Sequence, residues 1–114
     1  MGAGSKDSNN NFTGVLMGEV KTAGKNESDV GLLGYADGAR TFFLNSKDGS
    51  ATFGKNNSGQ IIINPSNGAQ IYGGNYSTEK KSGMLIDLSK PTIQYGSGNF
   101  IVDDEGHLTA KGGG

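Results

Sequence analysis

The chain contains three segments that follow one thirteen-residue plan: FFLNSKDGSATFG at Phe42–Gly54, IIINPSNGAQIYG at Ile61–Gly73 and MLIDLSKPTIQYG at Met84–Gly96. Each begins with three apolar residues and an Asn or Asp, passes through turn residues, and ends with an aromatic residue and Gly. A shorter fourth copy, FIVDDEGHLTAK, occupies Phe100–Lys111 and has one turn residue fewer. Such repetition indicates a small structural unit that is built several times and stacked.

Each unit has the composition of two short β-strands joined by a turn. The apolar segments are short, rich in β-branched and aromatic residues, and bounded by Gly, Asn, Ser and Pro. In the second unit we expect Ile61–Asn64 to pair with Ala69–Tyr72. Turn pairs in which Gly follows Asp, Asn or Glu recur at 37–38, 48–49, 67–68 and 105–106. Because no window shows the apolar spacing of a helix, the sequence predicts an all-β fold.

Composition divides the chain into four segments. Residues 1–11 are small and polar, begin with a stretch that resembles a cloning scar, and are expected to be flexible. Residues 12–34 form a loosely patterned β segment or cap, in which the polar stretch Lys21–Asp29 is expected to be an exposed loop. Residues 35–111 hold the repetitive β-stalk, with units at 42–54, 61–73, 84–96 and 100–111. Residues 112–114 are a Gly linker.

The amount of core that a single copy can bury is small. The 114 residues include 21 Gly, no Trp and no Cys, and only 32% are hydrophobic. In the triplet Ile61–Ile63 the outer two side chains point to one face of a strand and the middle one to the other. A lone hairpin cannot bury both faces. We therefore predict an elongated stack of β-hairpins in which three chains wind about a common axis, as a triple-stranded β-helix or β-prism.

The four apolar triplets are the predicted core of this homotrimer. They comprise Phe42, Phe43, Leu44, Ile61, Ile62, Ile63, Met84, Leu85, Ile86, Phe100, Ile101 and Val102. A carboxylate placed at the shared axis would be present three times without a partner. The substitutions Ile62→Asp and Leu85→Asp are therefore expected to prevent assembly.

The repeats resemble a known family of proteins. The stretches GLLGYADGARTFFLNSKDGSATFGK at 31–55, SGQIIINPSNGAQIYGGNYS at 58–77 and GMLIDLSKPTIQYGSGNFIVDDEGHLTAKGGG at 83–114 are similar to the fibrous part of tail-fibre or tail-tip, baseplate-associated proteins of phages and prophages of Gram-positive bacteria. Residues 12–30 share the resemblance more loosely. Those fibres tend to be homotrimers with triple-stranded β-helical stalks, and they are usually far longer than this chain, which would then be a segment of such a protein.

The resemblance implies a structural role in a virion. The chain would be made in the bacterial cytoplasm and act in the extracellular phage tail, where it would contact other tail proteins and position host-attachment parts. An alternative is a module that binds carbohydrate or degrades polysaccharide, as hyaluronidase-like tail proteins do, with a host-surface glycan as its partner. A bacterial surface or biofilm repeat protein is a third interpretation of the same pattern.

Several other functions are disfavoured by composition. Ten basic residues stand against eleven acidic ones, and no basic run exceeds Lys80-Lys81, which argues against nucleic-acid binding. The longest apolar runs have three residues, too few to span a membrane. Glycine-rich phosphate-binding motifs that lead into a helix are absent from the sequence, so we predict no cofactor.

Metal and catalytic sites are likewise not predicted. His107, the single histidine, could meet its symmetry mates around a metal, but its place after the turn pair Glu105-Gly106 favours an exposed side chain. The acidic run at 103–106 lacks the calcium-loop spacing and is interpreted as a β-turn. The resemblance would draw catalytic groups from Asp87, Asp103, Tyr72, Tyr76, Tyr95 and Arg40. No spacing among these residues marks a pair of carboxylates suited to glycoside hydrolysis.

The aromatic position of the units is the last candidate feature. Phe53, Tyr72 and Tyr95 occupy the same place in three repeats. They could form a stacking surface for sugars, but a recurring place in a repeat is explained more simply by packing.

Overall fold

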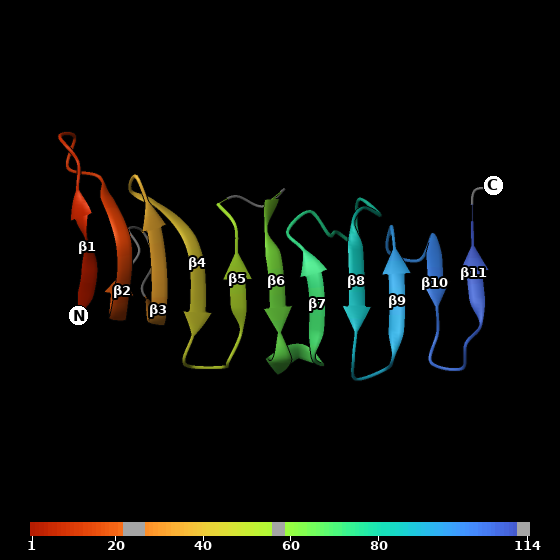
Figure 1. Ribbon diagram of the computed structural model, residues 1–114. Coiled ribbons are helices and arrows are strands. Elements are labelled where there is room, and N and C mark those ends of the chain that lie inside the picture. The colour runs from red at the N-terminus through yellow and green to blue at the C-terminus, as the bar shows by residue number, and fades with distance from the viewer. Residues whose placement is uncertain (22–26, 56–58, 112–114) are drawn as a thin grey trace.

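The described part of the chain forms one antiparallel β-sheet of eleven strands, and each strand pairs with the next along the sequence (Figure 1). The computed structural model describes residues 1–21, 27–55 and 59–111. The 3-10 turn η2 (Pro65–Asn67) joins β6 and β7. The all-β prediction is therefore confirmed. The strands are β1 (Gly2–Lys6), β2 (Phe12–Lys21), β3 (Ser28–Ala36), β4 (Ala39–Asn45), β5 (Ala51–Phe53), β6 (Ile61–Asn64), β7 (Gln70–Gly73), β8 (Met84–Asp87), β9 (Thr92–Tyr95), β10 (Phe100–Val102) and β11 (Leu108–Ala110).

The sheet is elongated because its strands run across the long axis. The molecule measures 54 × 26 × 23 Å and has a Cα radius of gyration of 17.5 Å. A compact domain of this length would have a radius of about 13 Å. Neighbouring strands lie roughly 4.8 Å apart, so an eleven-stranded row accounts for most of the long dimension. The sequence's prediction of an elongated row of hairpins agrees with this shape.

The predicted turn pairs lie at chain reversals. Asp37 and Gly38 both have positive φ, 50° and 81°, in the tight turn between β3 and β4. Gly49, Gly68 and Gly106 have φ values of 76°, 86° and 82° in the other three. Glycine reaches this left-handed region without steric cost, and this freedom explains why each of these reversals carries it.

The second unit pairs in a register that differs by one residue from the prediction. Ile61–Asn64 pairs with β7, so that Ile61 lies opposite Gly73 and Asn64 lies opposite Gln70. The prediction had placed Ala69–Tyr72 in that position. The cause is the connection, where η2 is followed by Ala69 in a left-handed conformation with φ of 57°. Ala69 therefore belongs to the turn instead of the strand.

The N-terminal segment differs from the flexible tail predicted for residues 1–11. Strand β1 pairs with the start of β2, and Gly4 lies opposite Gly14. The two backbones approach so closely that a Cβ on Gly4 would lie 2.2 Å from the carbonyl oxygen of Thr13. Backbone hydrogen bonds hold this pair together and need no apolar side chains. The composition therefore gave no sign of the strand.

Residues 12–34, predicted as a β segment or cap, belong to the same sheet. They supply β2 and most of β3. The exposed loop expected over Lys21–Asp29 falls mainly on residues 22–26, which lie outside the described residues, and its two ends belong to the strands. The predicted linker at residues 112–114 also lies outside the described part of the chain.

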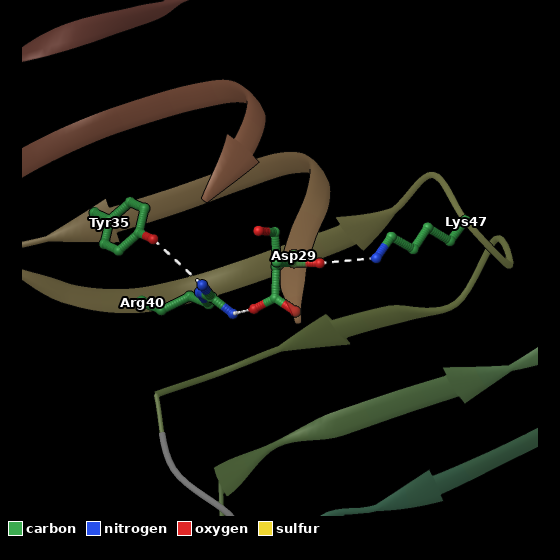
Figure 2. A network of polar contacts seen from close by, with 5 residues as sticks. Asp29, Tyr35, Arg40 and Lys47 are labelled. Carbon is green, nitrogen blue, oxygen red and sulfur yellow. Dashed lines mark hydrogen bonds and ion pairs between the residues drawn. The ribbon is translucent and has the colours of Figure 1, made fainter. Parts of the chain in front are cut away.

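The paired ends of β2 and β3 at Lys21 and Ser28 curl over one face of the sheet and enclose a small core (Figure 2). There the Asp29 carboxylate meets the Arg40 guanidinium on β4, with Oδ2 2.7 Å from Nη1 (Figure 2). The Arg40 guanidinium also lies 5.3 Å from the centre of the Phe43 ring. Leu33, on the face that the hairpin end covers, has no exposed surface.

Candidate functional site

Two rows of side chains form one continuous apolar face along the sheet. Residues directly opposite each other in antiparallel strands point to the same side, so the register identifies each face. The first row, called the aliphatic row, has one residue from each of β2 to β11. It consists of Met17, Leu32, Leu44, Ala51, Ile63, Ile71, Ile86, Ile93, Val102 and Leu108.

A second row lies beside the aliphatic row on the same face. It consists of Val15, Gly34, Phe42, Phe53, Ile61, Gly73, Met84, Tyr95, Phe100 and Ala110. We call the two rows together the apolar face. Neither row, as described from β2 to β11, contains a charged residue.

The apolar face is the open face of the chain. Thirteen large hydrophobic side chains are exposed in the described residues, and eleven of them belong to the two rows. Met17 is 58% exposed and Leu108, near the other end of the sheet, is 64% exposed. Soluble monomers rarely expose a continuous apolar patch of more than a few hundred Å². The face is therefore the strongest candidate for a binding surface.

The opposite face, which we call the mixed face, is better covered and more polar. Its central row begins with Leu16, Leu33 and Phe43 and continues with alternating polar and apolar residues. The later members are Thr52, Ile62, Tyr72, Leu85, Gln94, Ile101 and Thr109. Leu85 is only 6% exposed. Side chains of this face are therefore packed largely by their own chain.

The twelve predicted core residues divide between the two faces. The outer residues of each triplet lie on the apolar face: Phe42, Leu44, Ile61, Ile63, Met84, Ile86, Phe100 and Val102. The middle residues lie on the mixed face: Phe43, Ile62, Leu85 and Ile101. The predicted alternation within a triplet therefore agrees with the structure, and a single apolar face collects two thirds of the candidates.

Sequence reasoning missed most of the apolar face that comes from outside the triplets. Ile71 and Ile93 belong to the second strands of two units, and Met17 and Leu32 belong to the N-terminal hairpin. The signal was present as alternation, because apolar residues occupy every second position of these strands. In β7 and β9 it was hidden by the strand length of only four residues, and in β2 and β3 by consecutive apolar residues, Leu16-Met17 and Leu32-Leu33.

The recurring aromatic position does not correspond to one structural position. Phe53 and Tyr95 lie on the apolar face, whereas Tyr72 lies on the mixed face opposite Ile62 and Leu85. The one-residue register difference in the second unit is the cause, because such a shift moves every side chain of a strand to the other face. The common packing role expected from the sequence therefore does not hold for Tyr72.

The Asn or Asp that follows each triplet builds the turn at the end of its hairpin. The side-chain oxygen Oδ1 of Asn45, Asn64, Asp87 and Asp103 accepts a hydrogen bond from the backbone N–H two residues later, at 2.9, 3.2, 3.0 and 3.0 Å. Such Asx turns fold locally and hold the chain reversal in place. The sequence showed that these residues recur at the same position of each unit, but it did not show their role in the turn.

Asp87 is engaged by its own turn and is poorly suited to catalysis. Its Oδ1 accepts hydrogen bonds from the Ser89 hydroxyl at 2.6 Å and from the Lys90 N–H at 3.1 Å. The hydrogen bond from Ser89 is the main cause that lowers the pKa of Asp87 below its ordinary value, and bonds from Lys90 and Gln70 act in the same direction. A carboxylate stabilised in this way is a weak proton acceptor.

Asp103 and His107 form one exposed turn. Asp103 Oδ1 accepts the backbone N–H of His107 at 2.8 Å, and Oδ2 lies 3.2 Å from His107 Nδ1. The backbone bond from His107 is the main cause that lowers the pKa of Asp103. The His107 side chain is exposed, as its position after the turn pair predicted. In the described part of the chain, no cluster of three His, Cys, Asp or Glu residues could hold a metal ion.

The remaining catalytic candidates are separated. Arg40 is held by Asp29 and donates a second, longer hydrogen bond of 3.4 Å to the Tyr35 hydroxyl (Figure 2). Burial alone would lower the pKa of Arg40, but the hydrogen bonds to Asp29 and Tyr35 raise it. Tyr72 and Tyr76 have ring centres 6.0 Å apart, whereas Tyr95 lies on the apolar face. The geometry therefore gives an ion pair between Arg40 and Asp29 and an aromatic pair of Tyr72 and Tyr76.

Comparisons with protein-family models, with curated proteins and with solved structures found no match to this chain. Among the residues that the structure describes, no helix is long and apolar enough to cross a membrane.

Proposed function

We propose that this chain is a structural shaft segment of a phage tail fibre, in which three copies associate along a common axis and position host-attachment parts. The observation that carries the proposal is the apolar face of the sheet, which runs from β2 to β11 without a charged residue. The molecule that presents this face is 54 Å long. A row of hairpins gives length and stiffness, and the apolar face gives each copy a surface that must be covered.

The repeated Asx turns support a mechanical role. Four of them recur at the ends of alternate hairpins, between β4 and β5, β6 and β7, β8 and β9, and β10 and β11. Successive turns also contact one another, because the Leu88 N–H donates a hydrogen bond of 3.0 Å to the carbonyl oxygen of Ala69. A shaft that carries load needs such regular links along its length.

The mass of the chain in solution tests the proposal. The single chain has a mass of 11.7 kDa, so the trimer has a mass of about 35 kDa. Light scattering coupled to size-exclusion chromatography should give the trimer mass together with a β-type circular dichroism spectrum. A folded β spectrum at the mass of one chain would refute the proposal.

A second candidate function, glycan binding, is supported by a hollow of about 610 Å³ on the mixed face near the N-terminal hairpins. Phe12 and Tyr35 lie in it edge to face, with ring centres 6.0 Å apart. Asn10, Asn11 and Lys6 supply amide and ammonium groups at its rim. Apolar ring surfaces beside polar donors suit the C–H and hydroxyl groups of a sugar.

Glycan-array binding of the wild-type chain and of Tyr35→Ala tests the second candidate. Binding that Tyr35→Ala abolishes, with an unchanged circular dichroism spectrum, would support a sugar site. An array that gives no signal for the wild-type chain would refute glycan binding, and the shaft role would be the remaining candidate.

A further inference from the structure

We infer that copies of this chain meet through the apolar face, with the aliphatic row nearest the shared axis and the mixed face turned outward. This inference rests on the proposed function, since it names the partner and the surface of the assembly. The sequence alone predicted that all three residues of each triplet line the trimer core, Ile62 and Leu85 among them. The structure places both of them on the mixed face.

The extent of the apolar face is sufficient for a stable interface. The molecule is 54 Å long and 26 Å wide with its turns included, and the two rows take up about half of that width, so the apolar face covers on the order of 700 Å² in projection. Stable protein interfaces bury about 800 Å² from each partner. The two rows are also free of charge over their whole length, so no unpaired charge would be desolvated when a partner covers them.

A second copy of this chain is the occupant that fits the face best. In a parallel assembly each level of one copy meets the same level of another, so apolar residues meet apolar residues from β2 to β11. The face also has two hollows that can receive side chains. One, of about 570 Å³, is lined by residues that include Met17, Leu32 and Leu44. The other, of about 280 Å³, is lined by Met84, Ile93, Tyr95 and Phe100.

The narrow width of the sheet favours three copies over two. Strands β5 to β11 have only three or four residues each, and they present at most two side chains to the apolar face. Two such sheets packed about 10 Å apart would leave both long sides of the core open to water. Three sheets arranged as the walls of a prism close those sides. A three-fold axis also makes the three chains parallel.

Single cysteine substitutions test which face lies inside, because the chain has no Cys of its own. The test variants are Ile63→Cys and Ile93→Cys on the aliphatic row. Their matched controls are the neighbouring residues of the same strands on the mixed face, Ile62→Cys and Gln94→Cys. Each variant would be oxidised with copper phenanthroline and, separately, treated with a short bismaleimide, which tolerates more distance than a disulfide does.

The two variants on the aliphatic row should cross-link and the two controls should not. At a three-fold site one bond joins two of three chains, so cross-linking should approach a limit of about two thirds of the chains in dimers. Cross-linking that exceeds this limit would indicate a two-fold assembly and overturn the three-walled arrangement. Equal or stronger cross-linking of the controls would overturn the choice of face.

The light-scattering mass separates the failure of this inference from that of the proposed function. A trimeric wild-type chain whose aliphatic-row variants stay trimeric but give no cross-link with either reagent would refute the inference and leave the shaft role standing. A monomeric wild-type chain would refute both. Variants would be compared under reducing conditions first, so that a change in mass or in circular dichroism identifies any that do not fold.

Discussion

Truncation of Leu85 tests whether the mixed face is packed by its own chain. The Leu85 side chain is 6% exposed, so Leu85→Ala removes buried methyl groups and should lower the free energy of unfolding by about 2–5 kcal/mol. A domain of this size has a total stability of roughly 5–15 kcal/mol. A loss of about 3 kcal/mol corresponds to a decrease in Tm of roughly 10–15 °C.

Met84→Ala is the matched control, because Met84 is the neighbouring residue of β8 on the apolar face and is 46% exposed. In the single chain its truncation should cost only about 1 kcal/mol, since half of the side chain is already in water. The substitution Met84→Ala should have its larger effect on assembly. In light scattering, the variant trimer should dissociate at a higher protein concentration than the wild-type trimer does.

Thermal unfolding followed by circular dichroism at matched concentration measures both effects. We expect Leu85→Ala to lower Tm much more than Met84→Ala where the chains are dissociated. A Tm within about 2 °C of the wild type for Leu85→Ala would refute the reasoning, because such a small change corresponds to less than about 1 kcal/mol. It would mean that Leu85 is not enclosed by its own chain.

Three further predictions concern single positions. Gly34→Ala would place a Cβ 2.0 Å from the Phe42 ring, so it should lower Tm in circular dichroism, and combining it with Phe42→Ala should recover part of the loss. Asn64→Ala removes the acceptor for the Ser66 N–H and should lower the unfolding free energy in urea by about 1 kcal/mol, whereas Asn64→Asp, which keeps the acceptor, should not. The pKa of Asp87 is lowered in the folded state, so its contribution to stability is present above the ordinary value of 3.8 and is lost as pH falls through the lower folded pKa. Asp87→Asn should therefore reduce the loss of Tm between about pH 5 and pH 2, and an unchanged acid dependence would contradict this assignment.

The sequence by itself determined the local structure of this protein. Short β-branched segments bounded by Gly, Asn and Pro became strands, and the pairs Asp37-Gly38 and Asp48-Gly49 became reversals, because such residues act through the backbone conformation of their own neighbourhood. Alternation within the triplets followed from the period of a strand. The separation of Ile61 and Ile63 from Ile62 could therefore be predicted without any tertiary contact.

Only the tertiary structure decided the register, the faces and the long-range contacts. A left-handed Ala69 shifts the second unit by one residue and moves Tyr72 to the mixed face, and nothing in a gapless alignment of the repeats shows that shift. The pairing of β1 and the contact between Asp29 and Arg40 depend on chain segments that meet only when the sheet has formed. Which face remains open is likewise a property of the folded sheet: the curled hairpin covers one side and leaves the two apolar rows exposed on the other.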